Sequence, residues 1–212
     1  MENTKIYSNI RWLELKVLVG CEFSGTVRDC FIAMGHDAIS CDLLPTEARG
    51  PHIQGDVLDV LYDDSWDLAI LHPPCTYLAS SGLHWNRKIP GRAEKTEEAL
   101  AFIAQMWRAP VDKMCIENPV GCINTRLDFM PKPQYVQPYN YGEDASKKTG
   151  LWLRGLAPLT PTETIEPRYV DGKPRWGNQG DTGYDKFGGG QGKERSVTFF
   201  GIAAAMANQW GS

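Results

Sequence analysis

The chain has 212 residues, of which 42% are hydrophobic and 23% charged, and its formal net charge is −4. This length is typical of one domain, or one domain with a small appendage, and it excludes a long multidomain machine. The net negative charge argues against binding nucleic acid by bulk positive charge, although a local basic face is compatible with it. The sequence contains neither a secretory signal nor an apolar run of the roughly 18 residues that span a membrane. We therefore expect a cytoplasmic protein with no membrane anchor.

The cysteines and histidines are scattered along the chain. The six cysteines occupy positions 21, 30, 41, 75, 115 and 122, so no C-x-x-C pair is present to begin a zinc or thioredoxin-like site. The four histidines form no cluster in the sequence either. We expect reduced thiols and no metal site.

The first part of the chain predicts a strand, a turn, a helix and two further strands. Lys16 to Gly20 is a short apolar, β-branched run, which is typical of a buried strand. A turn over 21–25 follows, and apolar residues with helical spacing then predict a helix over 26–34. Residues 38–42 form a strand that ends on an acid, and residues 53–57 repeat this pattern.

The rest of the chain continues the alternation. The remaining predictions are strands over 66–72, 113–116 and 151–153 and helices over 93–107 and 201–210. Residues 158–195 are rich in Gly, Pro and charge and predict a loop or a very small subdomain. Strands that alternate with helices predict an α/β, Rossmann-like fold with a largely parallel sheet and helices on both faces. In such folds ligands bind beyond the carboxyl ends of the strands.

Three strand ends carry residues suited to a nucleotide-like ligand. Phe23-Ser24-Gly25 after the first strand would let the backbone approach a ligand at a helix N-terminus. Asp42 could accept hydrogen bonds from ribose hydroxyls, and Asp56 from an exocyclic amine. Because the full G-x-G-x-x-G fingerprint is absent, a tight turn followed by a solvated acid is the alternative interpretation.

A cysteine and a glutamate follow two neighbouring strands. In His72-Pro73-Pro74-Cys75 the prolines stiffen the backbone and would hold the Cys75 thiol at the rim of the sheet. The alternative is that Cys75 is a small buried hydrophobe. Glu117 lies at the end of the next strand, where a parallel sheet would bring its carboxylate beside the thiol. Cys and Glu together suit attack on a pyrimidine, in which the thiolate adds to the ring and the carboxyl group assists at the ring nitrogen.

These residues together resemble the S-adenosylmethionine-dependent DNA (cytosine-5)-methyltransferases, in the compact form often encoded by bacteriophages. The matching segments are Phe23-Ser24-Gly25, Asp42, Gly55-Asp56-Val57, Pro74-Cys75, Glu117-Asn118 and residues 141–149, in the order of the family and within residues 16–153. The resemblance implies methyl transfer from S-adenosylmethionine to carbon 5 of a flipped-out cytosine in DNA, through a covalent Cys75 adduct. A phage-encoded member would act in the bacterial host cytoplasm, in the setting of restriction and modification.

The resemblance also implies a role for individual residues. The implied catalytic residues are Cys75, Glu117, Asn118 and Lys147. The implied cofactor-binding residues are Glu22, Phe23, Ser24, Gly25, Asp42, Leu43, Asp56, Val57 and Pro73. The implied DNA-binding residues are Ser81, His84, Arg87, Lys88, Arg92, Lys148, Arg175 and Trp176. Stacking on a base is expected of Trp176 and of Tyr184.

The resemblance further implies how the chain is organised. Residues 1–159 and 196–212 would form the catalytic domain, and 160–195 a minimal Gly-rich recognition insertion. Within residues 145–195 there are nine Lys and Arg against six Asp and Glu. Residues 80–92 would form a mobile loop that closes over the substrate.

The sequence departs from the family pattern at several positions. Thr26-Val27 follows Gly25 where a second glycine is usual, and Thr76 follows the cysteine in place of Gln. Pro119 stands in place of Val, and Lys147-Lys148 in place of paired arginines.

Two other functions remain open at this point. The first is an amino-methyltransferase of DNA bases, which would carry an acid, Asn or Ser before the two prolines and an aromatic residue after them, where this chain has His72 and Cys75. The second is a catalytically silent protein that binds DNA or the cofactor.

Overall fold

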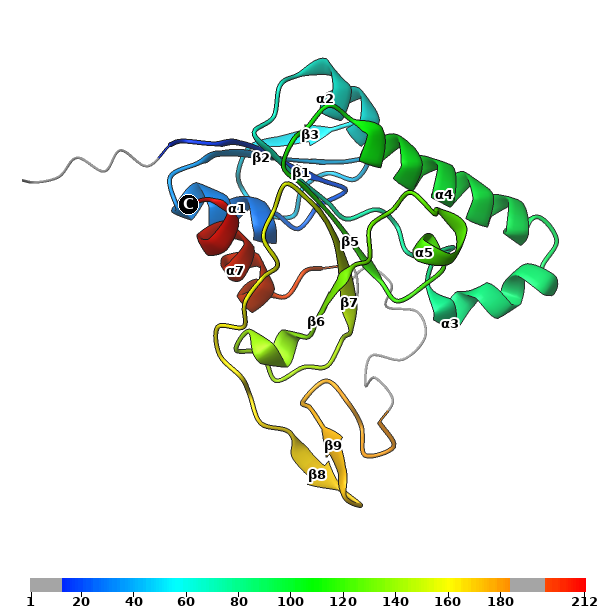
Figure 1. Ribbon diagram of the computed structural model, residues 1–212. Helices are drawn as coiled ribbons and strands as arrows, with labels where there is room; N and C mark the ends of the chain where they lie inside the picture. Colours follow the sequence, from blue (N-terminus) through cyan, green and yellow to red (C-terminus); the bar gives the residue numbers. More distant parts are fainter. Residues whose placement is uncertain (1–12, 184–196) are drawn as a thin grey trace, which may run out of the picture.

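A computed structural model describes residues 13–183 and 197–212 and contains one large sheet (Figure 1). Its strands are β1 (Lys16–Gly20), β2 (Asp37–Asp42), β3 (His52–Gln54), β4 (Leu68–Leu71), β5 (Met114–Pro119), β6 (Gln134–Val136) and β7 (Thr149–Arg154). A separate hairpin consists of β8 (Arg168–Val170) and β9 (Lys173–Arg175). The α-helices are α1 (Thr26–Ala33), α2 (Val57–Asp63), α3 (Ser80–Leu83), α4 (Arg92–Arg108), α5 (Ile123–Arg126) and α7 (Phe200–Trp210). Two 3-10 helices, η1 (His84–Arg87) and η2 (Pro138–Asn140), complete the described elements.

The order of the strands in the sheet is β3-β2-β1-β4-β5-β7-β6. Strands β1 to β5 are parallel to one another, whereas β7 is antiparallel to both β5 and β6. The connection from β6 to β7 contains no crossover helix, and a crossover of that kind is needed only between parallel strands. The order reverses between β1 and β4, which is the switch point at which ligands bind in open α/β sheets.

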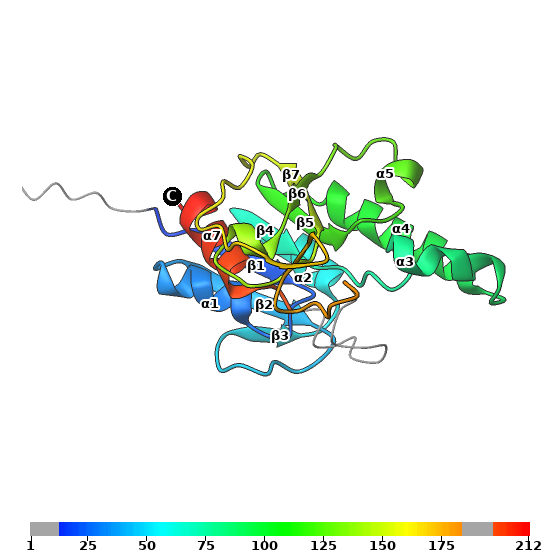
Figure 2. The same ribbon diagram turned by 90° about the horizontal axis from the view of Figure 1, so that it is seen from below.

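Helices cover both faces of the sheet. Side chains alternate along β1, so that Val17 and Val19 belong to one hydrophobic core and Leu18 to the other. The first core includes residues of α1 and α7, which lie beside each other in Figure 2, and the second includes residues of α2 and α4. The expectation of an α/β fold with a largely parallel sheet and helices on both faces is confirmed.

Some elements differ from the sequence-based expectation. The strand predicted over 53–57 ends at Gln54, because Asp56 caps a helix that the sequence analysis did not predict, with its side chain accepting the Leu58 N–H at 2.9 Å. The strand predicted over 113–116 continues to Pro119, because β7 pairs with it as far as Thr149. Strands β6, β8 and β9 were missed because each has only three residues.

The predicted mobile loop over 80–92 is helical in the structure. It forms α3, η1 and the first residue of α4. The Asn86 side chain donates to the Thr96 hydroxyl at 2.8 Å, and the Arg92 guanidinium donates to the Thr76 carbonyl at 3.0 Å. These bonds tie the segment to α4 and to the chain just after Cys75, and its closure over a substrate stays a prediction.

The Gly-rich segment is described only up to residue 183. Its β8 and β9 hairpin projects away from the large sheet (Figure 1), and the chain then returns to the main body. There the Trp176 ring stacks on Tyr139 with centroids 4.2 Å apart, and Asn178 exchanges hydrogen bonds with Ser146. Tyr184 lies outside the described residues, and the division of the chain at residue 160 stays a prediction. Over the described ranges, no helix is long and apolar enough to cross a membrane.

Candidate active site

A cavity of about 190 Å³ lies at the carboxyl ends of β1, β2 and β3. It is lined by Cys21, Asp42, Leu43, Gly55, Asp56, Val57, Pro74 and Phe102. Four of these, Asp42, Leu43, Asp56 and Val57, are residues that the sequence predicted to hold a cofactor. Cys21 and Phe102 were missed, since Phe102 belongs to the periodic pattern of α4 and no sequence signal separates it from an ordinary helix residue.

The two acids of this cavity are fixed by local hydrogen bonds. One oxygen of Asp42 accepts the Leu44 N–H at 2.9 Å, and one oxygen of Asp56 accepts the Leu58 N–H at the same distance. The second oxygen of each carboxylate makes no hydrogen bond to any described residue. Each acid is therefore held in place and keeps an acceptor for a ligand hydroxyl or amine.

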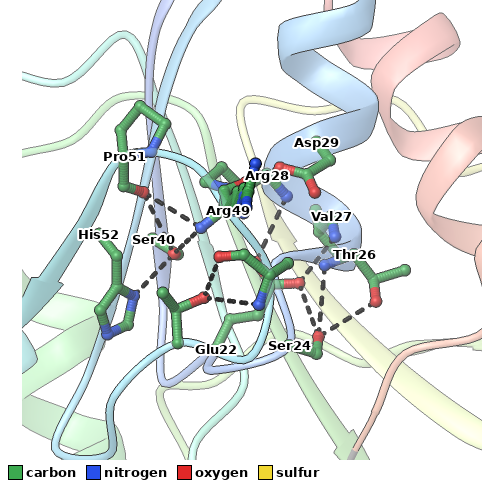
Figure 3. A network of polar contacts seen from close by, with 12 residues as sticks. Glu22, Ser24, Thr26, Val27, Arg28, Asp29, Ser40, Arg49, Pro51 and His52 are labelled. Atoms are coloured by element: carbon green, nitrogen blue, oxygen red, sulfur yellow. Dashed lines mark hydrogen bonds and ion pairs between the residues drawn. The ribbon is translucent and has the colours of Figure 1, made fainter.

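The loop after β1 is organised by Glu22. This side chain is 5% exposed, and its carboxylate accepts the Val27 N–H at 2.7 Å and the Arg28 N–H at 3.3 Å at the start of α1 (Figure 3). The Ser24 hydroxyl lies 3.4 Å from the same carboxylate, and Gly25 adopts a φ of 76° before the helix begins. Burial raises the pKa of Glu22, and the charge of His72 and the two N–H groups oppose this rise without reversing it.

The residues of this loop that were predicted to bind the cofactor do not line the cavity. Within the described chain, the residues that line the cavity do not include Glu22, Phe23, Ser24 or Gly25. Pro73 does not line it either, although its neighbour Pro74 does. Glu22 has a structural role as the cap of α1, and a direct cofactor contact by the loop stays a prediction.

A fully buried arginine braces the same region. The Arg28 guanidinium donates to the Ser40 hydroxyl at 3.0 Å and to the carbonyls of Arg49 and Pro51 at 3.1 and 3.3 Å (Figure 3). Its Nε also pairs with Asp29 at 2.8 Å. Arg28 thus ties α1 to β2 and to the loop between β2 and β3. This role could not be predicted from the sequence, because an arginine on a short helix is usually exposed.

The segment that carries Cys75 is held against the end of β5. The buried Asn118 amide donates to the Pro73 carbonyl at 2.8 Å. Just after β5, the Cys122 N–H donates to the Leu78 carbonyl at 3.0 Å, and a Cβ at Gly121 would collide with that same carbonyl oxygen. Asn118 at the end of β5 and the residues just after β5 therefore hold the backbone on both sides of Cys75.

Cys75 differs from the other five cysteines in its exposure. It is exposed, whereas Cys21 is half-buried and Cys30, Cys41, Cys115 and Cys122 are buried. Burial is the main cause that raises the pKa of Cys30 and Cys41 to about 11, and burial also raises the pKa of Cys21. A thiol with a raised pKa holds little of the nucleophilic thiolate. Cys75, which follows β4, is the exposed cysteine and does not share the burial of these thiols.

Glu117 lies on β5 beside the first residue after β4. Its side chain is 14% exposed, and Oε2 is 3.3 Å from Nδ1 of His72. Burial alone would raise the pKa of Glu117, but the contact with His72, the charge of Lys147 and a hydrogen bond from Thr149 hold that pKa below its ordinary value. The structure thus brings Glu117, Lys147 and His72 together, and His72 was not among the predicted site residues.

The predicted DNA-binding residues fall into two groups. Ser81, His84, Arg87 and Lys88 are exposed on α3, η1 and the turn after them. Of the first group, Lys88 lies over the Trp85 ring. The others already have partners: Arg92 lies over Tyr77, Lys148 lies over Tyr135, and Arg175 donates to the Pro174 and Asp181 carbonyls. Trp176 is stacked on Tyr139. Their contact with DNA stays a prediction. In the part of the chain that the structure describes, no group of three or more His, Cys, Asp and Glu could hold a metal ion.

No protein family model and no curated protein matches the sequence. Among solved structures, the chain is similar to a candidate DNA modification methyltransferase encoded within a prophage (E. coli), with 14% identity and a TM-score of 0.47 over 72% of this chain and 52% of that one. It is also similar to a chain of a type I R-M system, with 14% identity and a TM-score of 0.39 over 73% of this chain and 44% of that one. The chain spans about half the length of these solved chains. Neither likeness is close enough to assign a reaction.

Proposed function

We propose that the chain is a DNA (cytosine-5)-methyltransferase that uses S-adenosylmethionine, with Cys75 as the nucleophile. The observation that supports the proposal is the arrangement of residues at the carboxyl ends of the neighbouring strands β4 and β5. There the exposed Cys75 follows a backbone segment that accepts a hydrogen bond from Asn118 of β5. Glu117, the residue before Asn118 in β5, provides a carboxylate. An exposed thiol and an oriented carboxylate that follow neighbouring strands are the groups needed for covalent attack on a pyrimidine ring.

The cavity at the ends of β1, β2 and β3 fits the nucleoside part of the cofactor. Asp42 and Asp56 each keep a free carboxylate oxygen for ribose hydroxyls and the adenine amine. Leu43, Val57 and Phe102 supply apolar walls for the adenine ring. When bound there, S-adenosylmethionine supplies the methyl group.

The residues of the chain then carry the steps at the base. The Cys75 thiolate forms a bond to carbon 6 of a flipped-out cytosine, and the ring electrons move towards carbon 5 and the ring nitrogen. The ring nitrogen takes up a proton from solvent, and the Glu117 carboxylate stabilises the resulting N–H by accepting its hydrogen bond. After carbon 5 is methylated, solvent takes up the carbon 5 proton, the Cys75 thiolate departs and the ring nitrogen returns its proton to solvent, which restores the neutral aromatic ring. Lys147 stabilises the ionised form of Glu117 throughout.

The test is incubation with labelled S-adenosylmethionine and cytosine-rich DNA, duplex and single-stranded, followed by nucleoside mass spectrometry. We expect 5-methylcytosine from the wild type and none from Cys75→Ser, which should still bind the cofactor by calorimetry. Cys122→Ser is the matched control, since Cys122 is the N-cap of α5, a position at which serine is favourable. Normal turnover by Cys75→Ser would refute the mechanism.

The same product analysis separates the alternatives. An amino-methyltransferase would methylate an exocyclic nitrogen, and the residue before its prolines would have to face that amine. Here that residue is His72, whose side chain is 6% exposed and directed to Glu117, which speaks against this chemistry. Cofactor binding without any modified nucleoside would instead favour a silent binder of DNA or cofactor.

A further inference from the structure

His72 joins three parts of the fold at the candidate active site. Its backbone N–H extends β4 by donating to the Gly20 carbonyl of β1 at 2.9 Å. Its ring Nδ1 lies 3.3 Å from Oε2 of Glu117 on β5 and 3.4 Å from Oγ1 of Thr198, just before α7. The imidazole is therefore fixed by its own backbone and by contacts from two other segments.

The contact between His72 and Glu117 requires a proton. An imidazole nitrogen without hydrogen and an ionised carboxylate are both acceptors, so they attract each other only when Nδ1 or the carboxyl group carries a proton. Either arrangement makes a hydrogen bond along the same line and fixes the orientation of the Glu117 carboxyl group. The second ring nitrogen, Nε2, is buried and has no hydrogen-bond partner among the residues described, so Nδ1 makes the hydrogen bonds of this ring.

We propose that His72 is a positioning residue for Glu117. Through Nδ1 it holds Oε2 of the carboxyl group and leaves Oε1 for the ring nitrogen of the pyrimidine, while Oγ1 of Thr198 lies 3.4 Å from Nδ1 and shares its single hydrogen-bonding position. This inference rests on the proposed function, because Glu117 needs a fixed orientation only if it meets a base.

The groups around the imidazole support this role. Glu22, in the loop after β1, interacts with the imidazole through its charge. Glu117 of β5 and Thr198, just before α7, contact the ring at Nδ1. The charge of Lys147, just before β7, and a hydrogen bond from Thr149, the first residue of β7, lower the pKa of Glu117. The contact with His72 is the largest of the influences that lower the pKa of Glu117, after the opposing effect of burial. Loss of the imidazole should therefore raise the pKa of Glu117.

The test is a double-mutant cycle on the full chain with the 5-methylcytosine assay. His72→Phe keeps a ring of similar size without a donor, and we expect kcat to fall about 10- to 100-fold, less than the largest losses that removal of a general acid or base produces. The KM values for DNA and cofactor should stay unchanged. His72→Asn places an amide nitrogen near the position of Nδ1 and should restore most of kcat. In a Glu117→Gln background, His72→Phe should cause no further loss, because residues that act as one unit are not additive.

A second measurement does not depend on activity. The carboxyl carbon of Glu117, followed by NMR as the pH is changed, should titrate at higher pH in His72→Phe than in the wild type. Equal losses in His72→Asn and His72→Phe, additive losses with Glu117→Gln, or an unchanged Glu117 titration would each overturn the positioning role. A wild type that binds cofactor but forms no 5-methylcytosine would refute the proposed function instead, and the titration would still decide whether His72 holds Glu117.

Discussion

Replacing Asn118 with alanine removes the side-chain hydrogen bond that joins the end of β5 to the segment carrying Cys75. Asn118 is 1% exposed and donates to the Pro73 carbonyl at 2.8 Å, and Pro73 is itself buried. The variant leaves that carbonyl without its partner, which costs about 1–3 kcal/mol of unfolding free energy. For a domain of this size each kcal/mol lowers Tm by about 2–4 °C, so we expect a decrease of about 2–12 °C.

The effect on turnover should be larger than the effect on stability. The freed segment positions the Cys75 thiol, and a displacement of about 1 Å at a reacting group can lower the rate about 100-fold. We therefore expect kcat for 5-methylcytosine formation to fall by about this factor at a temperature where the variant is fully folded, with cofactor affinity unchanged. Thermal unfolding, calorimetry and single-turnover kinetics measure the three quantities.

Asn124 provides a matched control for this variant. Its amide also donates to a proline carbonyl at 2.8 Å, that of Pro131, and it lies on α5, where it also accepts a hydrogen bond from Trp152. Asn124→Ala should lower Tm while kcat stays at the wild-type value. The reasoning would be refuted if Asn118→Ala lost stability but kept its kcat, or if both variants slowed turnover equally.

Three further predictions follow from the site. Burial raises the pKa of Glu22, so the stability that this group contributes is present at low pH and is lost as the pH rises through its pKa in the folded protein. Glu22→Gln should therefore remove this pH dependence of the free energy of unfolding, measured with urea. An unchanged pH profile in the variant would contradict the prediction. Phe102→Ala should weaken S-adenosylmethionine binding about 10-fold by calorimetry through loss of an apolar wall, whereas Phe129→Ala, which does not line the cavity, should not. A thiol reagent should label Cys75 first in the native protein and should lose this fast phase in Cys75→Ser; rapid labelling that persists in the variant would point to another thiol.

Sequence patterns predicted that the candidate site residues share one edge of the sheet, and the strands that precede them are parallel in the structure. Once the apolar runs before Asp42, His72 and Glu117 are taken as parallel strands, their carboxyl ends must meet. The same patterns could not reveal which side chains serve the fold and which serve a ligand. The carboxylate of Glu22, which was predicted to bind a cofactor, also caps α1, because a helix start needs acceptors for its free N–H groups, and its cofactor contact stays a prediction.

Contacts between distant segments account for most of what the sequence did not predict. Arg28 and His72 obtain their roles from partners that are far away in the chain, such as Pro51 for the arginine and Thr198 for the histidine. Short elements were missed for a different reason. A strand of three residues such as β6 has too few positions for its alternation to be recognised, and it is stabilised by pairing with β7.

Pairing with β7 limits how the backbone around Glu117 can open to solvent. β7 pairs with β5 along its whole length, so Glu117 and Asn118 lie inside a ladder and not on a loop. The one of these two backbone amides that donates to β7 should exchange with deuterium only when the sheet itself opens, whereas the amides of residues 75–92 should exchange through local opening. The carboxylate would thus remain in place while residues 75–92 adjust, and a substrate would be admitted by movement of that segment.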